Sequence, residues 1–578
     1  MPVTDLSFRI GGEAGQGLES SGAGFAKALT RAGLHVIGVP DYYSRIRGGH
    51  NYFTIRASDQ PVWAVKETIE ILLALDGETV TRHAGRIVPG GAIIIDDKIK
   101  FDEGLLAERD IRLVRLPLVE IAEREGNALM VNTGALAVAA ALTGFDLEYM
   151  MGVIADNFGR KGEAVTQANR RVAQAAHDLV LERYGDIVPW KVIPQKAPPR
   201  MCLTGNHAFA MGALMGGCKF AAAYPMTPAT SILEYMAAHA EWGVAAKHAE
   251  DEIAAVNMAV GAAFTGVRAM VSTSGGGFDL MTEGISLAGI CEVPLVIFLG
   301  GRPGPATGMA TRTAQADLFL AMHAGHGEFP RVILAPHTPE ECFQVAARAF
   351  NIAEKYQCVV IVLSDHYLAD SFFSTPLDNC TVDAIRIDRG KLISPEQVGA
   401  LAEYKRYALT DDGVSPRALP ASGPNAVYLT TSDEHLEDGQ ITEDAEVATA
   451  MANKRLRKLE TARADIRSPY RYGPEKAQLT LVSWGSSFGP VYEAMNALNA
   501  KGVAANMVQF VDLWPFPAEA ARQSLADAKR IVVVEGNATA QFAFMLHAYG
   551  DIRVDQKLLR YDGRSFTAEY ILDHVEVR

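Results

Sequence analysis

The sequence predicts an α/β protein with three domains built on mainly parallel sheets. Two observations lead to this expectation: short apolar strand patterns alternate with helical patterns, and several of the strands run directly into glycine-rich turns. The length of 578 residues favours three to four domains. Apolar residues make up 49% of the chain and charged residues 21%, which is typical of a globular protein with an ample core.

The first domain is expected over residues 1–190. A glycine loop at 11–17 follows the first strand, and the helix after it carries Phe25 and Leu29 at period-four spacing. The strands and the helix expected here are 6–10, 18–32 (the helix), 69–75 and 92–96. Strands that alternate with helices indicate a parallel sheet. A proline-bearing linker is expected from 188 to 199.

The second and third domains are expected over residues 200–385 and 478–578. The polar segment 386–477 between them contains proline, glycine and an acidic stretch, so we expect a long connection with one helix near its end. The apolar strands expected in these two domains are 269–273, 295–299, 359–363, 479–484 and 530–535.

Charge and composition exclude several classes of partner. A net charge of −14 argues against general binding of nucleic acid or anionic membranes, which needs a basic surface. No apolar run is long enough to span a membrane, and the first residues lack the basic and apolar regions of a signal peptide, so we expect a cytoplasmic protein. The six cysteines form no CxxC pair, so an iron-sulfur cluster or structural zinc in this chain is not expected.

Two neighbouring motifs indicate half of a thiamine diphosphate site. The segment 224–230 reads Tyr-Pro-Met-Thr-Pro-Ala-Thr, and an acidic cluster at 250–252 follows about 20 residues later. Thiamine chemistry needs a carboxylate beside the aminopyrimidine ring, in apolar surroundings that favour a shared proton. Glu252 is the best candidate because the small apolar residues after it permit close packing. The alternative is that the cluster only complements a helix dipole.

Thr227 and Arg302 are candidates for binding a substrate carboxylate. Thr227 before Pro228 also fits a helix N-cap, with Ser231 and Glu234 forming a capping box, and a hydroxyl at a helix start can donate to a carboxylate. Arg302 follows the strand at 295–299, and ligands of parallel sheets bind at the carboxyl ends of strands. An incidental arginine in a glycine-proline turn is the alternative.

The first glycine loop could hold a phosphate at the start of the helix after it. Gly12, Gly15 and Gly17 make a poor dinucleotide fingerprint, because no acidic residue stands about 20 positions further on. Arg45 and Arg47 add charge that suits a phosphorylated ligand such as coenzyme A, and a solvated basic turn is the alternative.

One expected motif is missing. A thiamine enzyme needs Mg²⁺ for the diphosphate, usually signalled by Gly-Asp-Gly and a later asparagine, and the chain has no Gly-Asp-Gly. We therefore expect no metal site in this chain, and expect another subunit to hold the diphosphate.

Taken together, the motifs resemble the 2-oxoacid:ferredoxin oxidoreductases, specifically the alpha subunit of the 2-oxoglutarate type with a gamma domain fused at its N-terminus. The resemblance covers nearly the whole chain. The matching segments are 11–17, 45–51, 224–230, Glu252, 302–308, 363–365, 413–420 and 535–537.

The resemblance implies functions for the domains. Residues 1–190 would be a gamma-type domain associated with coenzyme A, 200–385 the pyrimidine-binding thiamine diphosphate domain, and 478–578 a domain like the C-terminal domain of transketolase. It also implies the oxidation of a 2-oxoacid with coenzyme A and ferredoxin to an acyl-CoA and carbon dioxide, in either direction.

The resemblance also implies roles for single residues and for partners. Glu252 would activate the aminopyrimidine, Thr227 and Arg302 would bind the C1 carboxylate, and Thr307 would line the pocket. Tyr224 and Pro225 would lie on the cofactor's pyrimidine side. A beta subunit would hold Mg²⁺, the rest of the shared thiamine diphosphate and a [4Fe-4S] cluster. The two subunits would form an (alpha-beta)2 heterotetramer that reduces ferredoxin.

Two questions stay open at this point. The second carboxylate of 2-oxoglutarate needs a further cation, which Arg312 or a histidine such as His323 could supply. A pyruvate or branched-chain 2-oxoacid enzyme is the nearest alternative, and a non-catalytic assembly subunit is another. A nucleotide-binding dehydrogenase is disfavoured by the poor fingerprint.

Overall fold

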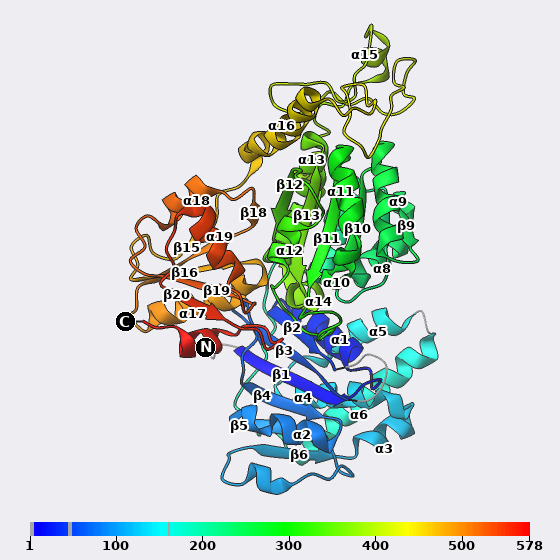
Figure 1. Cartoon of the computed structure of the whole chain (residues 1–578). Coiled ribbons are helices and arrows are strands. Elements are labelled where there is room, and N and C mark those ends of the chain that lie inside the picture. The colour runs from blue at the N-terminus through cyan, green and yellow to red at the C-terminus, as the bar shows by residue number, and fades with distance from the viewer. Residues whose placement is uncertain (1–4, 44–48, 160–161, 578) are drawn as a thin grey trace. The chain divides into compact units, whose positions relative to one another are not determined.

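The structure is a computed structural model that describes residues 5–43, 49–159 and 162–577. The chain divides into two compact units. Unit 1 comprises Met1–Thr204, Asp370–Asn379 and Thr567–Asp573, and unit 2 comprises Gly205–Ala369, Cys380–Phe566 and His574–Arg578. Figure 1 shows the elements of both units. Over the three sheets taken together most strand pairs are parallel, and helices flank the sheets, which confirms the predicted fold class.

Unit 1 is built on an eight-stranded sheet of order β6-β5-β4-β1-β3-β2-β14-β7. Its strands are β1 (Asp5–Glu13), β2 (His35–Asp41), β3 (His50–Ser58), β4 (Ile69–Ala74), β5 (Ile87–Asp96), β6 (Arg112–Leu116), β7 (Arg200–Thr204) and β14 (Phe372–Pro376). The four strands from β6 to β1 are parallel, whereas β3, β2, β14 and β7 join by antiparallel pairs. The parallel sheet expected from the sequence therefore corresponds to only one half of this eight-stranded sheet.

Helices cover both faces of this sheet. They are α1 (Leu18–Arg31), α2 (Gly77–His83), α3 (Leu118–Glu125), α4 (Val131–Leu142), α5 (Leu147–Phe158) and α6 (Glu163–Arg183), with α20 (Ala568–His574) near the chain's end. Successive residues of β4 enter different cores: Ile71 and Leu73 join the core under α1 and α4, whereas Leu72 joins the core on the other face. Two buried faces explain why residues 71–74 of this strand form a continuous apolar run.

The glycine loop is shorter than the sequence suggested. β1 continues to Glu13 because Gly11, Gly12 and Glu13 pair with the start of β3. The loop is therefore the four residues from 14 to 17. Gly15 and Gly17 both have positive φ, at 92° and 75°, a conformation that favours glycine.

The central part of unit 2 is a seven-stranded sheet of order β18-β12-β13-β11-β10-β8-β9, parallel except for β18. Its strands are β8 (Phe220–Ala223), β9 (Ala245–His248), β10 (Ala269–Ser274), β11 (Leu295–Gly301), β12 (Arg331–Leu334), β13 (Val359–Asp365) and β18 (Asp512–Trp514). The chain passes from β8 outward to β9 and then returns to β10 on the other side of β8. This change of direction is a topological switch point, where parallel sheets bind ligands.

Helices flank the central sheet, and a smaller sheet completes unit 2. The helices are α7 (Gly205–Met215), α8 (Thr230–Ala238), α9 (Glu252–Phe264), α10 (Gly275–Leu280), α11 (Thr282–Ile290), α12 (Leu318–His323), α13 (Pro339–Tyr356) and α14 (His366–Asp370). The smaller sheet and its helices are β15 (Tyr470–Tyr472), β16 (Leu479–Trp484), β17 (Ala505–Phe510), β19 (Ile531–Glu535), β20 (Gln556–Leu559), α17 (Phe488–Ala500), α18 (Ala518–Leu525) and α19 (Gln541–Gly550).

Gln315 joins the two sheets of unit 2. Its side chain donates to the carbonyl of Trp484 at 2.9 Å and accepts from the amide of Gly536 at 2.8 Å, and its backbone amide donates to the Gly536 carbonyl at 2.8 Å. The strand β18 lies in the central sheet although its neighbours in sequence belong to the smaller one. A shared core and these bonds make the two sheets parts of one unit.

The segment 386–477 contains α15 (Pro395–Gly399) and, near its end, the expected helix, α16 (Ala445–Ala462). Arg406 donates to the Glu292 carbonyl at 2.9 Å, and Lys458 donates to the Gln357 carbonyl at 3.1 Å. Glu292 and Gln357 precede β11 and β13, so the segment covers the amino ends of the central strands, as Figure 1 shows at the top of the view. The site described below lies at the opposite, carboxyl ends of the same strands.

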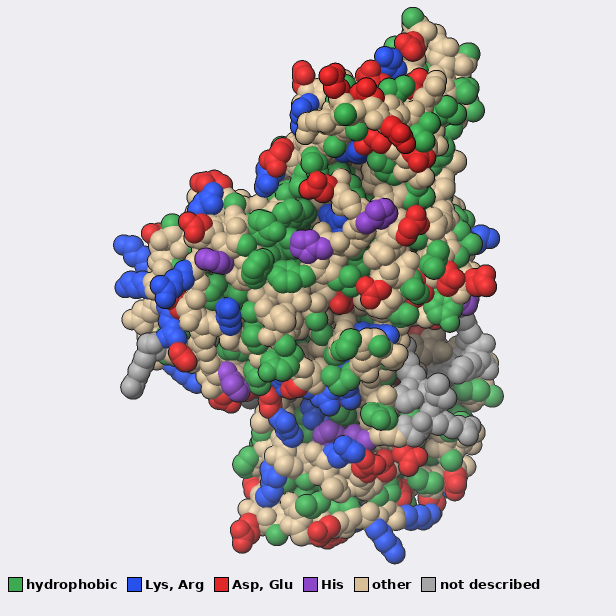
Figure 2. Space-filling view, in the orientation of Figure 1, with side chains coloured by type: hydrophobic (Ala, Val, Ile, Leu, Met, Phe, Trp, Pro, Cys, Tyr) green, Lys and Arg blue, Asp and Glu red, His purple; other side chains and the backbone are tan. Residues whose placement is uncertain are grey.

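Hydrophobic side chains gather on the face of unit 2 shown in Figure 2, over α12 and α19. There the rings of Phe319 and Phe544 lie 5.4 Å apart between centroids, and Phe544 is 53% exposed. Among the helices of the described part of the chain, none combines the length and the apolar character needed to cross a membrane.

Candidate functional site

Polar residues converge at the carboxyl ends of four neighbouring strands of the central sheet. Thr227 follows β8, Glu252 follows β9, Ser274 ends β10 and Arg302 follows β11. These strands lie on both sides of the switch point, so their carboxyl ends meet at one edge of the sheet, the region where parallel sheets bind ligands. This edge is called the crevice below. Three predicted residues, far apart in sequence, are thus placed at the same edge of the sheet.

Glu252 is buried, with 3% of its surface exposed, although it is the first residue of α9. The helix is capped by Asp251 instead, whose carboxylate accepts from the amide of Ala254 at 2.7 Å. Glu252 Oε1 is buried and has no hydrogen-bond partner. Since Asp251 already satisfies the helix start, the alternative that the acidic cluster serves only the helix dipole does not account for Glu252.

Gly277 of α10 leaves the space beside that free oxygen. A Cβ atom at position 277 would lie 2.5 Å from Glu252 Oε1 and would also overlap the hydroxyl of Thr273. A buried carboxyl oxygen that lacks a partner and is bordered by glycine suits a hydrogen bond to a ring nitrogen. The residues present therefore fit the aminopyrimidine of thiamine diphosphate.

Thr227 does not cap a helix, so this part of the sequence prediction is wrong. The helix α8 begins at Thr230 with Ala229 as its N-cap, and no side chain caps it. Asn206 donates to the Pro228 carbonyl at 2.6 Å and to the Ser231 hydroxyl at 2.8 Å. These bonds keep Pro228 outside the helix and engage Ser231, so the expected capping box cannot form.

Arg302 lies beside Thr227. Its Nη1 donates to the Thr227 carbonyl at 2.9 Å, which joins the segments that follow β11 and β8. The side chain is half-buried, and burial lowers the pKa of the guanidinium, an effect that the nearby Asp317 carboxyl opposes. A partly desolvated guanidinium is a strong partner for a carboxylate.

Tyr224 and Pro225 are exposed and directly follow β8. The Tyr224 ring lies 6.1 Å from the ring of His248, which ends β9. Their exposure leaves them accessible to a ligand or to another subunit.

Thr307 and Arg312 lie further along the segment after β11. Thr307 is exposed, and its neighbour Ala306 lies over α10, with its carbonyl 3.9 Å from the position of a Cβ at Gly276. Arg312 packs against Gly563 of the smaller domain, whose Cβ position would be 3.0 Å from Arg312 Cβ. His323 is exposed at the end of α12, against the Phe319 ring.

The structure adds residues that the sequence analysis did not single out. Ser274 Oγ, Asp317 Oδ2 and Asn206 Oδ1 are buried without a hydrogen-bond partner. The sequence signal for Ser274 was present: three glycines, 275–277, follow directly after this residue and its buried strand, a pattern that marks a close approach to the backbone.

The glycine loop of unit 1 is held by side chains. Gln16 Oε1 accepts from the Glu13 amide at 2.8 Å, and Asn132 donates to the Gln16 carbonyl. Gly12 lies in β1 against Gln16, whereas Gly15 and Gly17 form the turn before α1. Arg45 and Arg47 lie outside the described residues.

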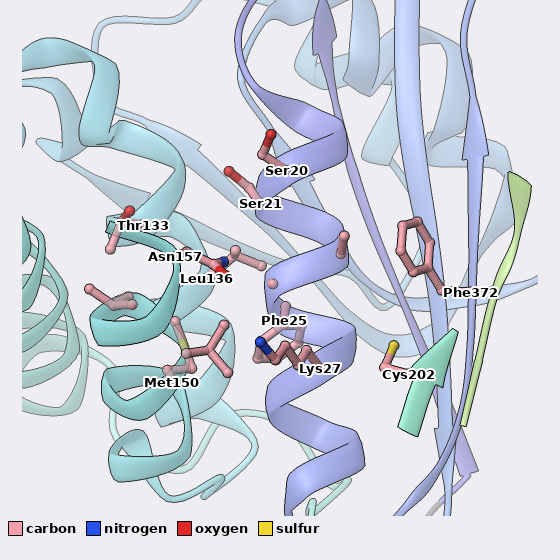
Figure 3. Close-up of a pocket in the computed structure, with 14 residues that line it drawn as sticks. Ser20, Ser21, Phe25, Lys27, Thr133, Leu136, Met150, Asn157, Cys202 and Phe372 are labelled. Atoms are coloured by element: carbon pink, nitrogen blue, oxygen red, sulfur yellow. The ribbon is translucent and has the colours of Figure 1, made fainter. Parts of the chain in front are cut away.

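A groove runs beside α1 in the same unit (Figure 3). Its cavity volume is about 440 Å³, and the side chains along it are mostly apolar, with Ser20, Ser21 and Lys27 on α1 and Thr133 and Asn157 on the helices facing it. Within the described residues, no group of three or more His, Cys, Asp or Glu side chains is arranged to hold a metal ion.

The protein has an α/β fold that contains a thiamine-binding domain. A family model described as "Pyruvate flavodoxin/ferredoxin oxidoreductase, thiamine diP-bdg" matches residues 211–454, and models for "Pyruvate ferredoxin/flavodoxin oxidoreductase" and "Transketolase, C-terminal domain" match residues 7–179 and 471–547. The chain belongs to the family of 2-oxoacid:ferredoxin oxidoreductase alpha subunits.

Similar proteins span the whole chain. The 2-oxoacid:ferredoxin oxidoreductase subunit alpha of a Sulfolobus species is 34% identical over 97% of this chain and 95% of its own length. The 2-oxoglutarate oxidoreductase subunit KorA of Mycobacterium tuberculosis is 27% identical over 98% and 91%. A solved structure of 2-oxoglutarate:ferredoxin oxidoreductase from Magnetococcus marinus, with 2-oxoglutarate, coenzyme A and succinyl-CoA bound, is 32% identical over 100% of both chains, with a TM-score of 0.92.

Proposed function

We propose that this chain is the alpha subunit of a 2-oxoglutarate:ferredoxin oxidoreductase with a gamma-type domain at its N-terminus. The reaction is 2-oxoglutarate, coenzyme A and two oxidised ferredoxins to succinyl-CoA, carbon dioxide, a proton and two reduced ferredoxins, in either direction. The observation that carries the proposal is the buried, unpartnered carboxyl oxygen of Glu252 at the switch point, beside Thr227 and Arg302.

Each residue has a role that follows from its position. Glu252 binds the pyrimidine ring of thiamine diphosphate and shares a proton with a ring nitrogen, because its free oxygen has no protein partner. When bound, thiamine diphosphate supplies a nucleophilic carbon and an acceptor for the electrons released on decarboxylation. Arg302 and the Thr227 hydroxyl hold the C1 carboxylate of the 2-oxoacid next to it.

The pocket also needs contacts for the rest of the substrate and cofactor. Thr307 lines the substrate pocket, and Tyr224 and Pro225 contact the cofactor on its pyrimidine side. For the second carboxylate of 2-oxoglutarate we keep Arg312 as the candidate cation. Its Cβ and Cγ atoms lie beside Gly563 of the smaller domain.

A beta subunit completes the site and holds Mg²⁺, the diphosphate and a [4Fe-4S] cluster. Apolar side chains on the elements around the crevice are 41% to 50% exposed, which favours burial against a partner. They are Tyr224, Ile253, Met258, Leu280 and Met309. An (alpha-beta)2 assembly that donates electrons to ferredoxin is the arrangement we propose.

The N-terminal domain holds or covers coenzyme A. The turn formed by Gly15 and Gly17 leaves the first amides of α1 without helical partners, and such amides bind phosphate groups. We propose that Gly12, Arg45 and Arg47 also contribute to the binding of coenzyme A.

Substitution of Glu252 tests the catalytic assignment. We expect Glu252→Gln to reduce turnover of the complex with the beta subunit by at least about 100-fold, because the amide cannot exchange a proton with the ring. Glu250→Gln is the matched control, since Glu250 is exposed and two residues away. If the assembled complex of the Glu252 variant showed normal turnover, the catalytic assignment would be wrong. The alternative of a non-catalytic assembly subunit would then hold.

A panel of 2-oxoacids tests the substrate. We expect kcat/KM for 2-oxoglutarate to exceed the values for pyruvate and branched-chain 2-oxoacids, with coenzyme A and a ferredoxin or dye as acceptor. Equal or higher values for pyruvate or a branched-chain acid would assign the chain to that alternative type.

A further inference from the structure

Asp317 stands at the N-cap of α12 but does not cap the helix. An aspartate at this position ordinarily accepts from amides of the first helical turn. The Asp317 side chain makes no such bond, and the amide of Phe319 donates instead to Gln541 Oε1 at 3.0 Å. Because Gln541 of α19 satisfies the helix start, the Asp317 carboxyl is available for another purpose.

The carboxyl lies against α10, the helix that also borders Glu252. A Cβ atom at Gly275 would lie 2.7 Å from Asp317 Oδ2, and that oxygen is buried without a hydrogen-bond partner. Glycines 275 and 277 thus each border a carboxyl group with a free oxygen, Asp317 at one and Glu252 at the other. Native proteins rarely leave such atoms unpaired outside functional sites.

The charged groups that act on Asp317 come from two elements, the exposed Asp279 of α10 and the half-buried Arg302 after β11. Burial raises the pKa of Asp317 to about 6, and Asp279 adds to this rise, while Arg302 opposes it. The interaction is mutual, since Asp317 also favours the charged form of Arg302.

We propose that Asp317 is a positioning residue of the substrate site, which sets the net charge that Arg302 presents to the C1 carboxylate of a 2-oxoacid. The inference rests on the function proposed above for Arg302. With a proton on Asp317, the charge of Arg302 is uncompensated and attracts the substrate anion. Without that proton, the Asp317 carboxylate competes with the substrate. Binding of the 2-oxoacid is therefore coupled to partial uptake of a proton by Asp317.

The pH dependence of KM tests this coupling in the complex with the beta subunit. For the unsubstituted protein we expect KM for 2-oxoglutarate to rise about fivefold to tenfold between about pH 5.5 and about pH 8.5, as a nearby charge at partial screening predicts. In Asp317→Asn this rise should be absent, because the amide carries no charge at any pH. The thermal unfolding midpoint is recorded to show that the variant is folded.

Proton uptake gives a readout that does not depend on turnover. N-oxalylglycine is an isostere of 2-oxoglutarate whose reactive carbonyl is replaced by an amide. Calorimetric titration at about pH 7 in two buffers of different ionisation enthalpy should show proton uptake with the unsubstituted complex and none with Asp317→Asn.

Two further variants make the outcome decisive. Asp279→Asn removes a negative charge near Asp317, so the rise in KM should occur at lower pH. If Asp317→Asn does not fold, this shift in the pH dependence of KM tests the proposal instead. Asp444→Asn is the matched control, because Asp444 caps α16 through bonds to the amides of Glu446 and Val447 and should change neither readout.

The possible failures are distinguishable. An active unsubstituted complex combined with an Asp317→Asn variant that keeps the pH dependence or the proton uptake would overturn the role of Asp317 alone. A complex that neither turns over any 2-oxoacid nor binds N-oxalylglycine would overturn the proposed function, and this inference with it.

Discussion

Gly277 shows how a single hydrogen atom in place of a side chain shapes the candidate site. We expect Gly277→Ala to weaken thiamine diphosphate binding by about 10- to 100-fold, since the new methyl group would overlap Glu252 Oε1 and the Thr273 hydroxyl. Binding is measured by calorimetric titration of the complex with the cofactor and Mg²⁺.

Gly276→Ala is the control for that substitution. Gly276 is exposed, and a Cβ there meets only the Ala306 carbonyl, at 3.9 Å. Binding should be unchanged in this variant. Equal loss in both variants would mean that α10 itself, and not the space beside Glu252, was disturbed.

Asp317 also makes a prediction about stability. Its pKa in the folded protein, about 6, is above the ordinary value of 3.8, so the folded state binds the proton more tightly than the unfolded state. The resulting cost to stability is absent below about pH 3.8, grows as the pH rises to about 6 and is constant above that, at up to about 3 kcal/mol.

We therefore expect Asp317→Asn to raise the Tm more at about pH 8 than at about pH 5, as measured by scanning calorimetry. A gain that is the same at both pH values would show that Asp317 does not titrate in this window.

The helix α16 is anchored by buried charges. Lys454 donates to Glu292 Oε1 at 2.6 Å, Lys458 pairs with Oε2, and all three side chains are buried. Burial disfavours the ionised carboxyl, yet the two lysines hold the pKa of Glu292 below its usual range. Burial lowers the pKa of Lys454 to about 7, against the effect of Glu292.

We expect Glu292→Gln to lower the free energy of unfolding of this region by about 3–5 kcal/mol, because two buried lysines would lose their counter-charge. Glu460→Gln breaks only an exposed pair with Arg463 and should cost no more than about 0.5 kcal/mol. Urea unfolding of both variants checks the contrast. A similar small effect in both would show that the lysines find other partners.

At the scale of elements, the long apolar strands that the sequence predicted are present, whereas short strands such as β8 and β9 and the start of α8 were not predicted. Strands such as β11 and β13 are continuous apolar runs buried on both faces, and their positions were predicted to within two residues. The start of α8 was predicted wrongly, because Asn206, more than 20 residues earlier in the chain, holds the Pro228 carbonyl. Contacts between distant segments override local capping preference.

The residues of the candidate site also differ in how far the sequence alone could predict them. Arg302 could be proposed because it follows the strand predicted at 295–299, and ligands of parallel sheets bind at the carboxyl ends of strands. Thr227 and Glu252 could be proposed only from the motifs that contain them, since the short strands before them, β8 and β9, were not predicted. Asp317 could not, because its sequence context reads as an ordinary N-cap. Only the bond from Phe319 to Gln541, about 220 residues later, shows that its carboxyl is not used for capping.

At the scale of the whole molecule, the exposed apolar side chains around the crevice predict a partner. We expect Met258→Arg and Leu280→Arg each to abolish co-purification with the beta subunit, because a buried arginine without a counter-charge is costly at an interface. Leu181→Arg is the control, since Leu181 on α6 is 44% exposed and lies outside this group.

Size-exclusion chromatography of each variant with the beta subunit measures the effect, and an unchanged Tm shows that the fold is intact. Retention of the complex by both crevice variants would place the partner elsewhere on the surface.

The pairing of β7 with β14 has a consequence for how this polypeptide can be divided. These two strands pair along residues 200–204 and 372–376, and β14 also pairs with β2. A chain ending near residue 190 would lose both strands and leave β2 as an open sheet edge, which invites pairing with other molecules. If the gene were divided at that point, the two polypeptides would have to associate by strand addition. The second polypeptide would contribute β14, which would pair with β2 of the first.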